Sequence, residues 1–486
     1  MNIDSQKLGV ILGAYNSPTC KCFAFRLSTM IVGCLLYSTI ATAAEKGGHS
    51  SSHEPRLSSE PMPFLTEAEL GERTPPLLEF GGDFLGTGNI RRGYEIPTGA
   101  IWTPRLWVYG TARTALQQFE RKGSDQKNSE WVNRFDLFAN LQLTGTERVV
   151  LGITPLHEDN RFSGYTFSPD QSEGSFDEFN SQIRTFFFEG DISELFPKWD
   201  VEDGKKNDIG FTVGRQQVLF QDGMTINDTL DAFGLSKNNI RFEGVPWLVN
   251  WRSSFLIAWD EVNRENNLED EDATLYALFN QWDTIKSTID LDLIYVDSEA
   301  EDGDLFVAAI DFIQRFGKIG STLRLAHSAA LDGASAVAGD GTLLFGEFNY
   351  VPAQTHDNLY ANFFAVFDNY TSAARDPLGG GPLGRVGLLY ASAGLGSYPA
   401  PLNNRANDAV GFSLGYQKID DHNRRQMTLE VGARNDDFND VTEYGIAARF
   451  QQALGKRFVL QVDGFLADGN DRDSTYGARL EFLVKL

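Results

Sequence analysis

Alternation of apolar and polar side chains is clearest in the last thirty residues of the chain. Between residues 474 and 486, alternate positions are apolar or small, namely Tyr476, Ala478, Leu480, Phe482, Val484 and Leu486. The positions between them include Thr475, Arg479, Glu481 and Lys485. Successive side chains of a β-strand point to opposite faces, so this period predicts a strand with one apolar face. Residues 456–467 repeat the pattern, and the polar stretch 468–473 predicts the turn between the two strands.

The same period recurs from residue 103 to the end of the chain and predicts about 18 strands. Most of them reach the roughly 9–11 residues that a tilted membrane strand needs. The predicted strands are 103–119, 131–144, 147–157, 182–190, 208–219, 238–245, 250–262, 273–281, 286–296, 304–316, 319–331, 341–351, 358–370, 408–419, 425–434, 441–452, 456–467 and 474–486. Counts of 16 or 20 stay open, because 77–86 could be a further strand and 386–398 could hold a hairpin.

The connectors between these strands alternate in length. If the first strand runs outward, the connectors after even strands are periplasmic; most are short, such as 145–146 and 317–318, with 191–207 as the exception. Connectors after odd strands include the long segments 158–181, 220–237 and 371–407. Short inner turns and long outer loops are typical of outer-membrane barrels. The alternative is a soluble β protein whose apolar faces form a core.

The apolar faces of the predicted strands favour a membrane barrel over a soluble β protein. In 250–262 the apolar face carries Trp251 and Trp259 at its two ends, which suits aromatic girdles at both membrane interfaces. After the N-terminus no apolar run reaches the ~18 residues of a membrane helix. The sequence therefore predicts an all-β fold, a transmembrane antiparallel β-barrel of about 18 strands.

The N-terminal region predicts export. Lys21 and Arg26 precede an apolar stretch and small-residue sites, so we expect a signal peptide over 1–44, cleaved after Ala43 or Ala44. A lipoprotein-type cleavage at Cys34 is the alternative. Residues 45–102 are rich in Ser, Gly and Pro and predict a flexible N-terminal segment before a barrel over 103–486. The only cysteines are Cys20, Cys22 and Cys34, so no disulfide or thiolate metal site is expected after cleavage.

The end of the chain resembles a known sorting signal. Thr475-x-Gly477-x-x-Leu480-x-Phe482 resembles the C-terminal signal by which outer-membrane barrels are recognised for insertion, although the chain ends in Leu486 where that family usually has Phe. The resemblance implies the outer membrane of a Gram-negative bacterium. It also implies as partners the barrel-assembly machinery, outer-membrane lipids and lipopolysaccharide.

Charge narrows the choice of partners. The 486 residues carry a formal net charge of −25, which disfavours nucleic acid. Acidic residues gather in predicted loops such as 265–272 and 468–473. They are either solvated surface or sites for divalent cations beside lipopolysaccharide phosphates.

The polar faces predict a water-filled pore, because a packed core would exclude charges of both signs. Guanidinium groups on neighbouring strands could pass an anionic solute from site to site. Alternatively, these charges only fill and stiffen the lumen. The residues predicted to line the path are Arg134, Arg184, Arg215, Arg241, Arg252, Arg324, Arg434, Arg449, Arg479, Asp136, Glu243, Asp260, Asp290 and Asp292. By simple alternation Arg215 shares a face with Phe211 and Val213, so it needs a bulge to face inward or else lies at the rim.

A short set of motifs gives a family resemblance. Gly214-Arg215-Gln216, Asp222-Gly223, Asp231-Ala232-Phe233 and Asn239-Ile240-Arg241 resemble the alginate-export family of outer-membrane channels, most clearly over residues 208–262. The resemblance implies an 18-stranded barrel that carries a polyanionic or small anionic solute by facilitated diffusion. The chain lacks an aromatic-Asn step expected in the loop, and its net charge is strongly negative, which leaves alginate itself open.

Catalysis finds little support in the sequence. The run Gly411-Phe-Ser-Leu-Gly415 lies inside a predicted strand, whereas a nucleophile elbow needs a strand-to-helix turn. We expect no enzyme activity, no cofactor and no metal. The predicted function is an outer-membrane porin-like channel for passive or facilitated diffusion of hydrophilic, anionic solutes or polysaccharide. The alternative is a non-conducting barrel that scaffolds or anchors an envelope complex.

Overall fold

The computed structural model describes residues 74–82, 93–121, 126–158, 161–169, 172–199, 208–299, 303–420, 423–437, 439–470 and 472–486. The chain divides into two compact units, Met1–Pro55 and Arg56–Leu486, and every described residue lies in the second. The predicted signal peptide and its cleavage site therefore lie outside the described residues.

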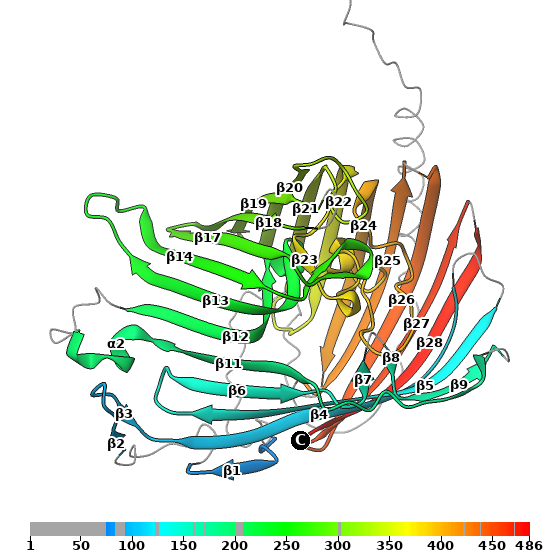
Figure 1. Cartoon of the computed structure of the whole chain (residues 1–486). Coiled ribbons are helices and arrows are strands. Elements are labelled where there is room, and N and C mark those ends of the chain that lie inside the picture. The colour runs from blue at the N-terminus through cyan, green and yellow to red at the C-terminus, as the bar shows by residue number, and fades with distance from the viewer. Residues whose placement is uncertain are drawn as a thin grey trace, which may run out of the picture. The chain divides into compact units, whose positions relative to one another are not determined.

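Eighteen long strands form one closed antiparallel sheet (Figure 1). They are β4 (Arg105–Glu120), β5 (Lys127–Gln142), β6 (Arg148–Ile153), β11 (Ile183–Asp191), β12 (Ile209–Phe220), β13 (Ile226–Ile240), β14 (Leu248–Trp259), β17 (Thr274–Thr284), β18 (Ser287–Asp297), β19 (Leu305–Phe316), β20 (Ile319–Ala330), β21 (Gly341–Tyr350), β22 (Asn358–Asn369), β24 (Asn407–Asp420), β25 (Arg425–Asp436), β26 (Val441–Leu454), β27 (Phe458–Gly469) and β28 (Arg472–Lys485). β28 pairs with β4, from Gly477 opposite Phe119 to Lys485 opposite Thr111, and closes the barrel. The predicted fold class is confirmed.

The remaining elements are short. The strands are β1 (Leu78–Phe80), β2 (Tyr94–Glu95), β3 (Ile101–Trp102), β7 (His157–Glu158), β8 (Arg161–Phe162), β9 (Gly164–Ser168), β10 (Gly174–Phe176), β15 (Val262–Arg264), β16 (Leu268–Asp270) and β23 (Ala374–Arg375). The helical turns are α2 (Ile192–Leu195), η2 (Pro197–Trp199), η3 (Gln221–Gly223), η4 (Glu265–Asn267), η5 (Pro377–Gly379) and η6 (Pro382–Arg385). No helix among the described residues is long and apolar enough to cross a membrane.

The prediction for the sixth strand is wrong. We expected a long outer connector over 220–237 and a strand over 238–245, but β13 begins at Ile226 and ends at Ile240. Its inward positions Ile226, Leu230 and Ala232 are apolar and fully buried. Its outward positions near the mouth include Asp231. Apolar inward residues also occur on neighbouring strands, such as Leu275 on β17 and Leu305 on β19, because this part of the wall packs against protein inside the barrel.

The structure also decides the two alternatives for the strand count, a further strand over 77–86 and a hairpin over 386–398. β1, within the segment 77–86, pairs over three residues with β4, from Leu78 opposite Val108 to Phe80 opposite Leu106. It adds a short strand beside the barrel. Residues 386–398 contain no hairpin.

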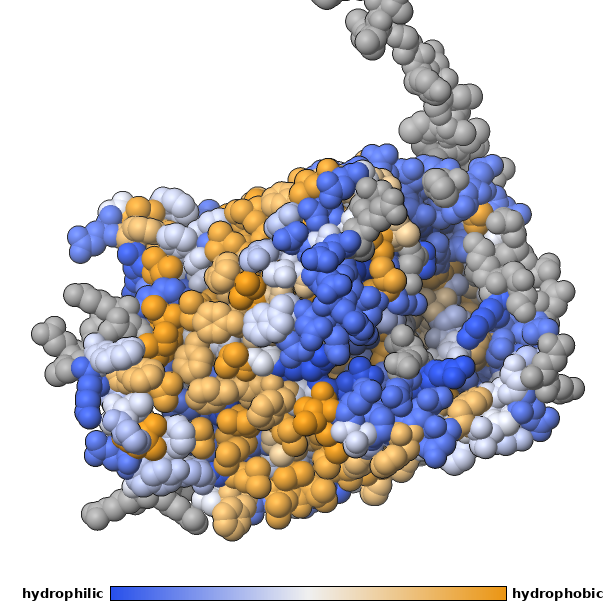
Figure 2. Space-filling view, in the orientation of Figure 1, coloured by the Kyte–Doolittle hydropathy of each residue, from blue (hydrophilic) through white to orange (hydrophobic). Residues whose placement is uncertain are grey.

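The outward faces form an apolar band. Outward residues of β4, β27 and β28 such as Leu116, Val462 and Leu480 are 42–52% exposed, whereas the inward Arg479 is 3% exposed. Figure 2 shows this band of hydrophobic residues between two hydrophilic margins. Surface of this kind is stable against lipid, and closure of the sheet leaves no unpaired backbone edge in the hydrocarbon.

The lumen is occupied by the segment 370–406, which joins β22 to β24 (Figure 1). We call it the infolded segment. Its side chains Tyr370, Leu383, Leu389 and Tyr390 are 0–1% exposed and belong to a hydrophobic cluster shared with inward residues of the strands. The apolar core of the barrel therefore lies inside it, between this segment and the wall.

The first part of the infolded segment is attached to β13 and the turn before it. β23 pairs in parallel with β13, Ile226 opposite Ala374. The hydroxyls of Tyr370 and Ser372 both donate to the carbonyl of Met224, at 3.0 and 2.7 Å. This attachment fixes the segment to one side of the lumen.

Arg375 holds the segment together from within. Its guanidinium donates to the hydroxyl of Ser372 at 2.8 Å and to the carbonyls of Gly223 and Gly380. Burial lowers the pKa of Arg375 to about 10, which leaves the group charged at neutral pH. A buried charge is tolerated only when its donors are satisfied, and these acceptors satisfy it.

The middle of the segment is attached to β25. The carboxylate of Glu430 accepts the backbone N–H groups of Leu388 and Leu389, both at 2.8 Å, and the hydroxyl of Tyr360. Ser413, within the Gly-x-Ser-x-Gly run on β24, donates to the carbonyl of Val386 at 2.8 Å. That serine therefore has a structural contact with the segment.

The lipid face gives one stability prediction. Leu480→Arg places a charge in the apolar band, and such a charge costs about 2–4 kcal/mol at the bilayer midplane. We expect the free energy of unfolding in lipid vesicles, measured by urea titration, to fall by about this amount. Gln461→Arg is the matched control, because Gln461 faces the lumen and donates to Asp463 at 2.7 Å. An equal loss in both variants would contradict the assigned faces.

The attachment of the infolded segment gives a second prediction. Glu430→Ala leaves two buried N–H groups without an acceptor, at a cost of about 1–3 kcal/mol each. We expect faster hydrogen exchange and proteolytic cleavage within 386–398 while the barrel itself stays folded. The control is Glu189→Ala, which removes a carboxylate paired with Arg148 at 2.6 Å on β6 and β11. If the segment stays as protected as in the wild type, Glu430 is not its anchor.

Candidate functional site: the barrel lumen

Four arginines on neighbouring strands line one side of the lumen. Arg113 is on β4, Arg134 on β5, Arg449 on β26 and Arg479 on β28. We call them the arginine strip. β5, β4, β28, β27 and β26 are hydrogen-bonded in that order, so the guanidiniums belong to one continuous wall. The side chains of Arg113, Arg134 and Arg449 are 20%, 25% and 30% exposed, whereas that of Arg479 is 1% exposed.

Each exposed arginine of the strip is paired with a carboxylate on the wall. Arg113 contacts Glu481 at 2.6 Å, and Arg134 contacts Asp136 at 2.9 Å. Arg449 contacts Asp463 at 2.6 Å, and Arg479 contacts the second oxygen of the same carboxylate at 3.1 Å. These charge-assisted bonds hold the guanidiniums in fixed orientations. They also offset much of the positive charge.

The infolded segment ends its crossing of the lumen on this strip. Arg113 and Arg134 donate to the carbonyls of Ala393 and Gly394, at 3.5 and 3.3 Å. Beside them Glu130 on β5 accepts the backbone N–H of Ser397 at 2.6 Å. The segment therefore contacts β13 at one end and β4 and β5 at the other, and it narrows the passage between them.

The opposite side of the lumen carries charges of both signs. Arg252 donates to the side-chain oxygen of Asn238 at 2.8 Å. It lines a polar cavity of about 380 Å³ together with Asp290 and Asp292. Arg252, Gln281 and Asp290 stand directly opposite one another on β14, β17 and β18. Arg252 is exposed and Asp290 partly exposed, whereas Asp292 is 2% exposed and accepts the hydroxyl of Thr225 at 3.3 Å.

Other predicted path residues are buried under the loops. The Arg324 side chain is 1% exposed and contacts Asp311 at 2.6 Å and Asp222 at 3.0 Å. The Arg434 side chain is fully buried and donates to the carbonyl of Arg405 in the infolded segment at 2.7 Å. Both arginines face inward, but in this structure they hold loops in place and have little surface to offer a solute.

Four predicted path residues lie away from the lumen wall. Arg215 is on the outward face of β12, where it contacts Asp231 at 2.8 Å and also Glu261, so no bulge turns it inward. Arg241 and Glu243 lie in the exposed turn after β13, and Asp260 lies in the exposed turn after β14. The error for Arg241 and Glu243 follows from placing the sixth strand too late.

Arg184 lies half-buried at the start of β11. Nearby, in the loop after β6, His157 is 6% exposed and its ring lies 4.5 Å from that of Phe162. Burial and the positive charges of Arg184 and Arg134 lower the pKa of His157 to about 4. His157 is therefore neutral at neutral pH and adds no charge to this end of the lumen.

Sequence reasoning missed Arg113 as a member of the arginine strip. The signal was present, because Arg113 and Gln117 occupy alternate positions on the polar face of the first predicted strand. It also missed Arg375, which belongs to a loop without periodicity. No cluster of side chains suited to a metal ion occurs among the residues that the structure describes.

Comparisons with known proteins give a fold and no family. No family model and no curated protein matches this chain. Among solved structures, the outer membrane protein OpdK of Pseudomonas aeruginosa superposes with a TM-score of 0.51 at 12% identity, covering 78% of this chain and 98% of that one. OccK7 (OpdD) of the same organism gives 0.51 at 10% identity with the same coverage. OpdK solved with vanillate gives 0.50 at 14% identity, again covering 78% and 98%.

The comparisons agree with the geometry of the barrel. They show a porin-like barrel, and they do not show the alginate-export family that residues 208–262 resemble. The closed sheet, the apolar band and the likeness to these outer-membrane structures place the chain in the outer membrane of a Gram-negative bacterium as a porin-like β-barrel.

Proposed function

We propose that this chain is a passive diffusion channel for small hydrophilic solutes whose anionic groups contact the arginine strip. The observation that carries the proposal is the partial exposure of three guanidiniums, Arg113, Arg134 and Arg449, on one continuous part of the wall where the infolded segment narrows the lumen. Charged side chains that face a lumen are stable when water reaches them. The water that hydrates these side chains fills the lumen, and polar solutes can diffuse through it.

The infolded segment favours small solutes over polymers. It contacts β13, β25, β4 and β5 and so occupies part of the cross-section at several points around the wall. The size of this obstruction argues against passage of a polysaccharide. The structure of OpdK with vanillate, a small carboxylate, supports a solute of this class by analogy of fold alone.

The ion pairs between the arginine strip and carboxylates of the wall limit the expected selectivity for anions. Each exposed guanidinium already contacts a carboxylate, so a passing anion exchanges or shares a partner rather than filling an empty site. In addition, the carboxylate of Asp290 lines a polar cavity on the other side. We therefore expect a preference for anions over cations that is modest and that falls as salt screens the charges.

The first functional prediction is conductance. Purified protein inserted into planar bilayers should give discrete conductance steps, because a lumen lined by charged groups holds water. Absence of steps from a correctly folded barrel would contradict the channel and favour a non-conducting scaffold.

The second functional prediction concerns the strip. Arg134→Gln combined with Arg449→Gln removes two of the three exposed guanidiniums and should lower the anion-to-cation permeability ratio, by roughly two-fold or more on electrostatic grounds. The ratio is measured from the reversal potential in a KCl gradient. Arg215→Gln is the control, because Arg215 lies on the outward face, and it should leave the ratio unchanged. An unaltered ratio in the double variant would remove the strip from the solute path.

A further inference from the structure

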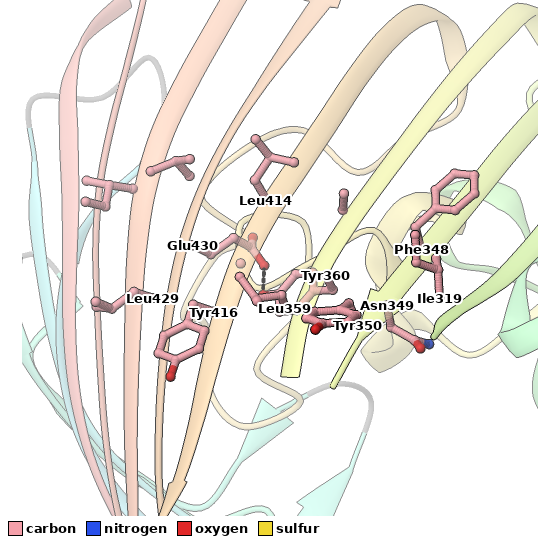
Figure 3. A pocket seen from close by; sticks show the side chains of 14 residues that line it. Ile319, Phe348, Asn349, Tyr350, Leu359, Tyr360, Leu414, Tyr416, Leu429 and Glu430 are labelled. Carbon is pink, nitrogen blue, oxygen red and sulfur yellow. Dashed lines mark hydrogen bonds between the residues drawn. The ribbon is translucent and has the colours of Figure 1, made fainter. Parts of the chain in front are cut away.

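An apolar groove runs along the outward face of the barrel in the half nearer the short turns. It has a volume of about 570 Å³ and spans β20 to β26. This volume lies within the ~300–1,000 Å³ typical of small-molecule sites. Figure 3 shows its lining side chains, with the hydrogen bond between Tyr360 and Glu430 behind it.

The groove lies between two rows of outward side chains. One row contains Phe348, Ala361 and Leu414, which stand opposite one another on β21, β22 and β24. The other contains Leu359 and Tyr416, again opposite one another on β22 and β24. Rows on one face of a strand are about 7 Å apart, which is two residues of rise. A single extended hydrocarbon chain fits between rows at that spacing.

A small residue makes the groove deep at its centre. Ala361 is flanked on its own row by the larger Phe348 and Leu414. Phe348 stacks on Phe363, with ring centroids 5.8 Å apart and an interplanar angle of 20°. Because Phe363 lies two residues further along β22, Phe348 packs toward the long-loop end and leaves the space over Ala361 open.

Cations stand on the short-turn side of the groove, beyond the row of Leu359 and Tyr416. Lys418 follows the lining residue Tyr416 by two positions on the same face of β24, and it stands opposite Met427 on β25. Arg425 is exposed at the start of β25, and Lys318 is exposed in the turn before β20. Lys418 pairs with Asp420 at 2.8 Å, and Arg425 donates to the side-chain oxygen of Gln452 at 2.7 Å, which leaves the other donors of Arg425 available. This end therefore attracts an anionic headgroup.

We propose that this groove binds a glycerophospholipid of the periplasmic leaflet, with one acyl chain between the two rows and the phosphate near Lys418 and Arg425. The apolar groove and the adjacent cations match the two ends of such a lipid. Short turns mark the periplasmic side of outer-membrane barrels, so the headgroup lies at the leaflet that contains phospholipid. Tyr416, whose hydroxyl donates to Asp357, stands between the two regions as amphipathic rings do at membrane interfaces.

A second copy of the chain suits the groove less well. Barrel walls are convex, so two of them would touch at the rims of the groove and leave its floor unfilled. A flexible acyl chain fills a concave channel without that mismatch. Contact between two copies at this face is therefore an outcome that would overturn the proposal.

The test uses phosphatidylglycerol with a diazirine on one acyl chain, in vesicles that contain the purified full-length barrel. After irradiation, labelled peptides are mapped by mass spectrometry. We expect labelling per outward residue on β22 and β24 to exceed that on β17 to β19 several-fold. Even labelling around the band, or cysteine crosslinks between two copies of an Ala361→Cys variant, would overturn the proposal.

Matched variants separate the groove from the general lipid surface. Ala361→Phe fills the groove and should reduce labelling of β22 and β24 to the level of the other strands. Ala308→Phe, on the outward face of β19, is the control and should leave the labelling of β22 and β24 unchanged.

A second pair of variants tests the cations. Lys418→Gln combined with Arg425→Gln should reduce labelling by phosphatidylglycerol. The control, Arg241→Gln combined with Lys286→Gln, alters cations on other short turns and should reduce it less. Equal effects in test and control variants would overturn the assigned site, and heat-modifiability on gels checks that each variant is folded.

Discussion

Backbone hydrogen bonding in hydrocarbon is the constraint on which this structure depends. An unpaired N–H or C=O group there costs several kcal/mol, so a sheet can cross a membrane only if it closes on itself. The pairing of β28 with β4 provides that closure. Once the sheet is closed, side chains divide into an outward set chosen for lipid and an inward set that is free to carry charge. The apolar band and the charged lumen are two consequences of the same pairing.

The inward set serves two purposes, which burial separates. Arg324, Arg434 and Arg375 are buried and bind carboxylates or carbonyl groups of the loops. They fix the segments that fold into the barrel. Arg113, Arg134 and Arg449 keep part of their surface exposed while a carboxylate orients each one. Of these six arginines, only the second group has exposed surface that a solute could contact. A charged residue on the inner face is therefore not by itself evidence for a solute path.

The sequence predicted the barrel because every membrane strand must satisfy the same period of two. Leu480 and Arg479 were assigned to opposite faces from alternation alone, and the structure agrees. The prediction failed at β13, where inward Leu230 and Ala232 are apolar and belong to the hydrophobic cluster that includes the infolded segment. The sequence could not predict that Arg449 stays partly exposed while Arg434 is buried. That difference depends on where the infolded segment lies, and the segment has no periodicity from which its position could be predicted. The sequence left open whether a bulge turns Arg215 toward the lumen. In the structure Arg215 lies on the outward face and contacts Asp231.

The central claim is that the arginine strip lies in a water-filled path while Arg215 lies outside it. The three cysteines of the chain, Cys20, Cys22 and Cys34, all precede residue 35, so replacing them with serine gives a background in which a single cysteine can be introduced. The most direct measurement is the current through Arg449→Cys and Arg215→Cys channels during treatment with a negatively charged, membrane-impermeant methanethiosulfonate. The account predicts that modification lowers the current of the Arg449→Cys channel and leaves that of the Arg215→Cys channel unchanged. An unchanged current in the first, or equal changes in both, would contradict it.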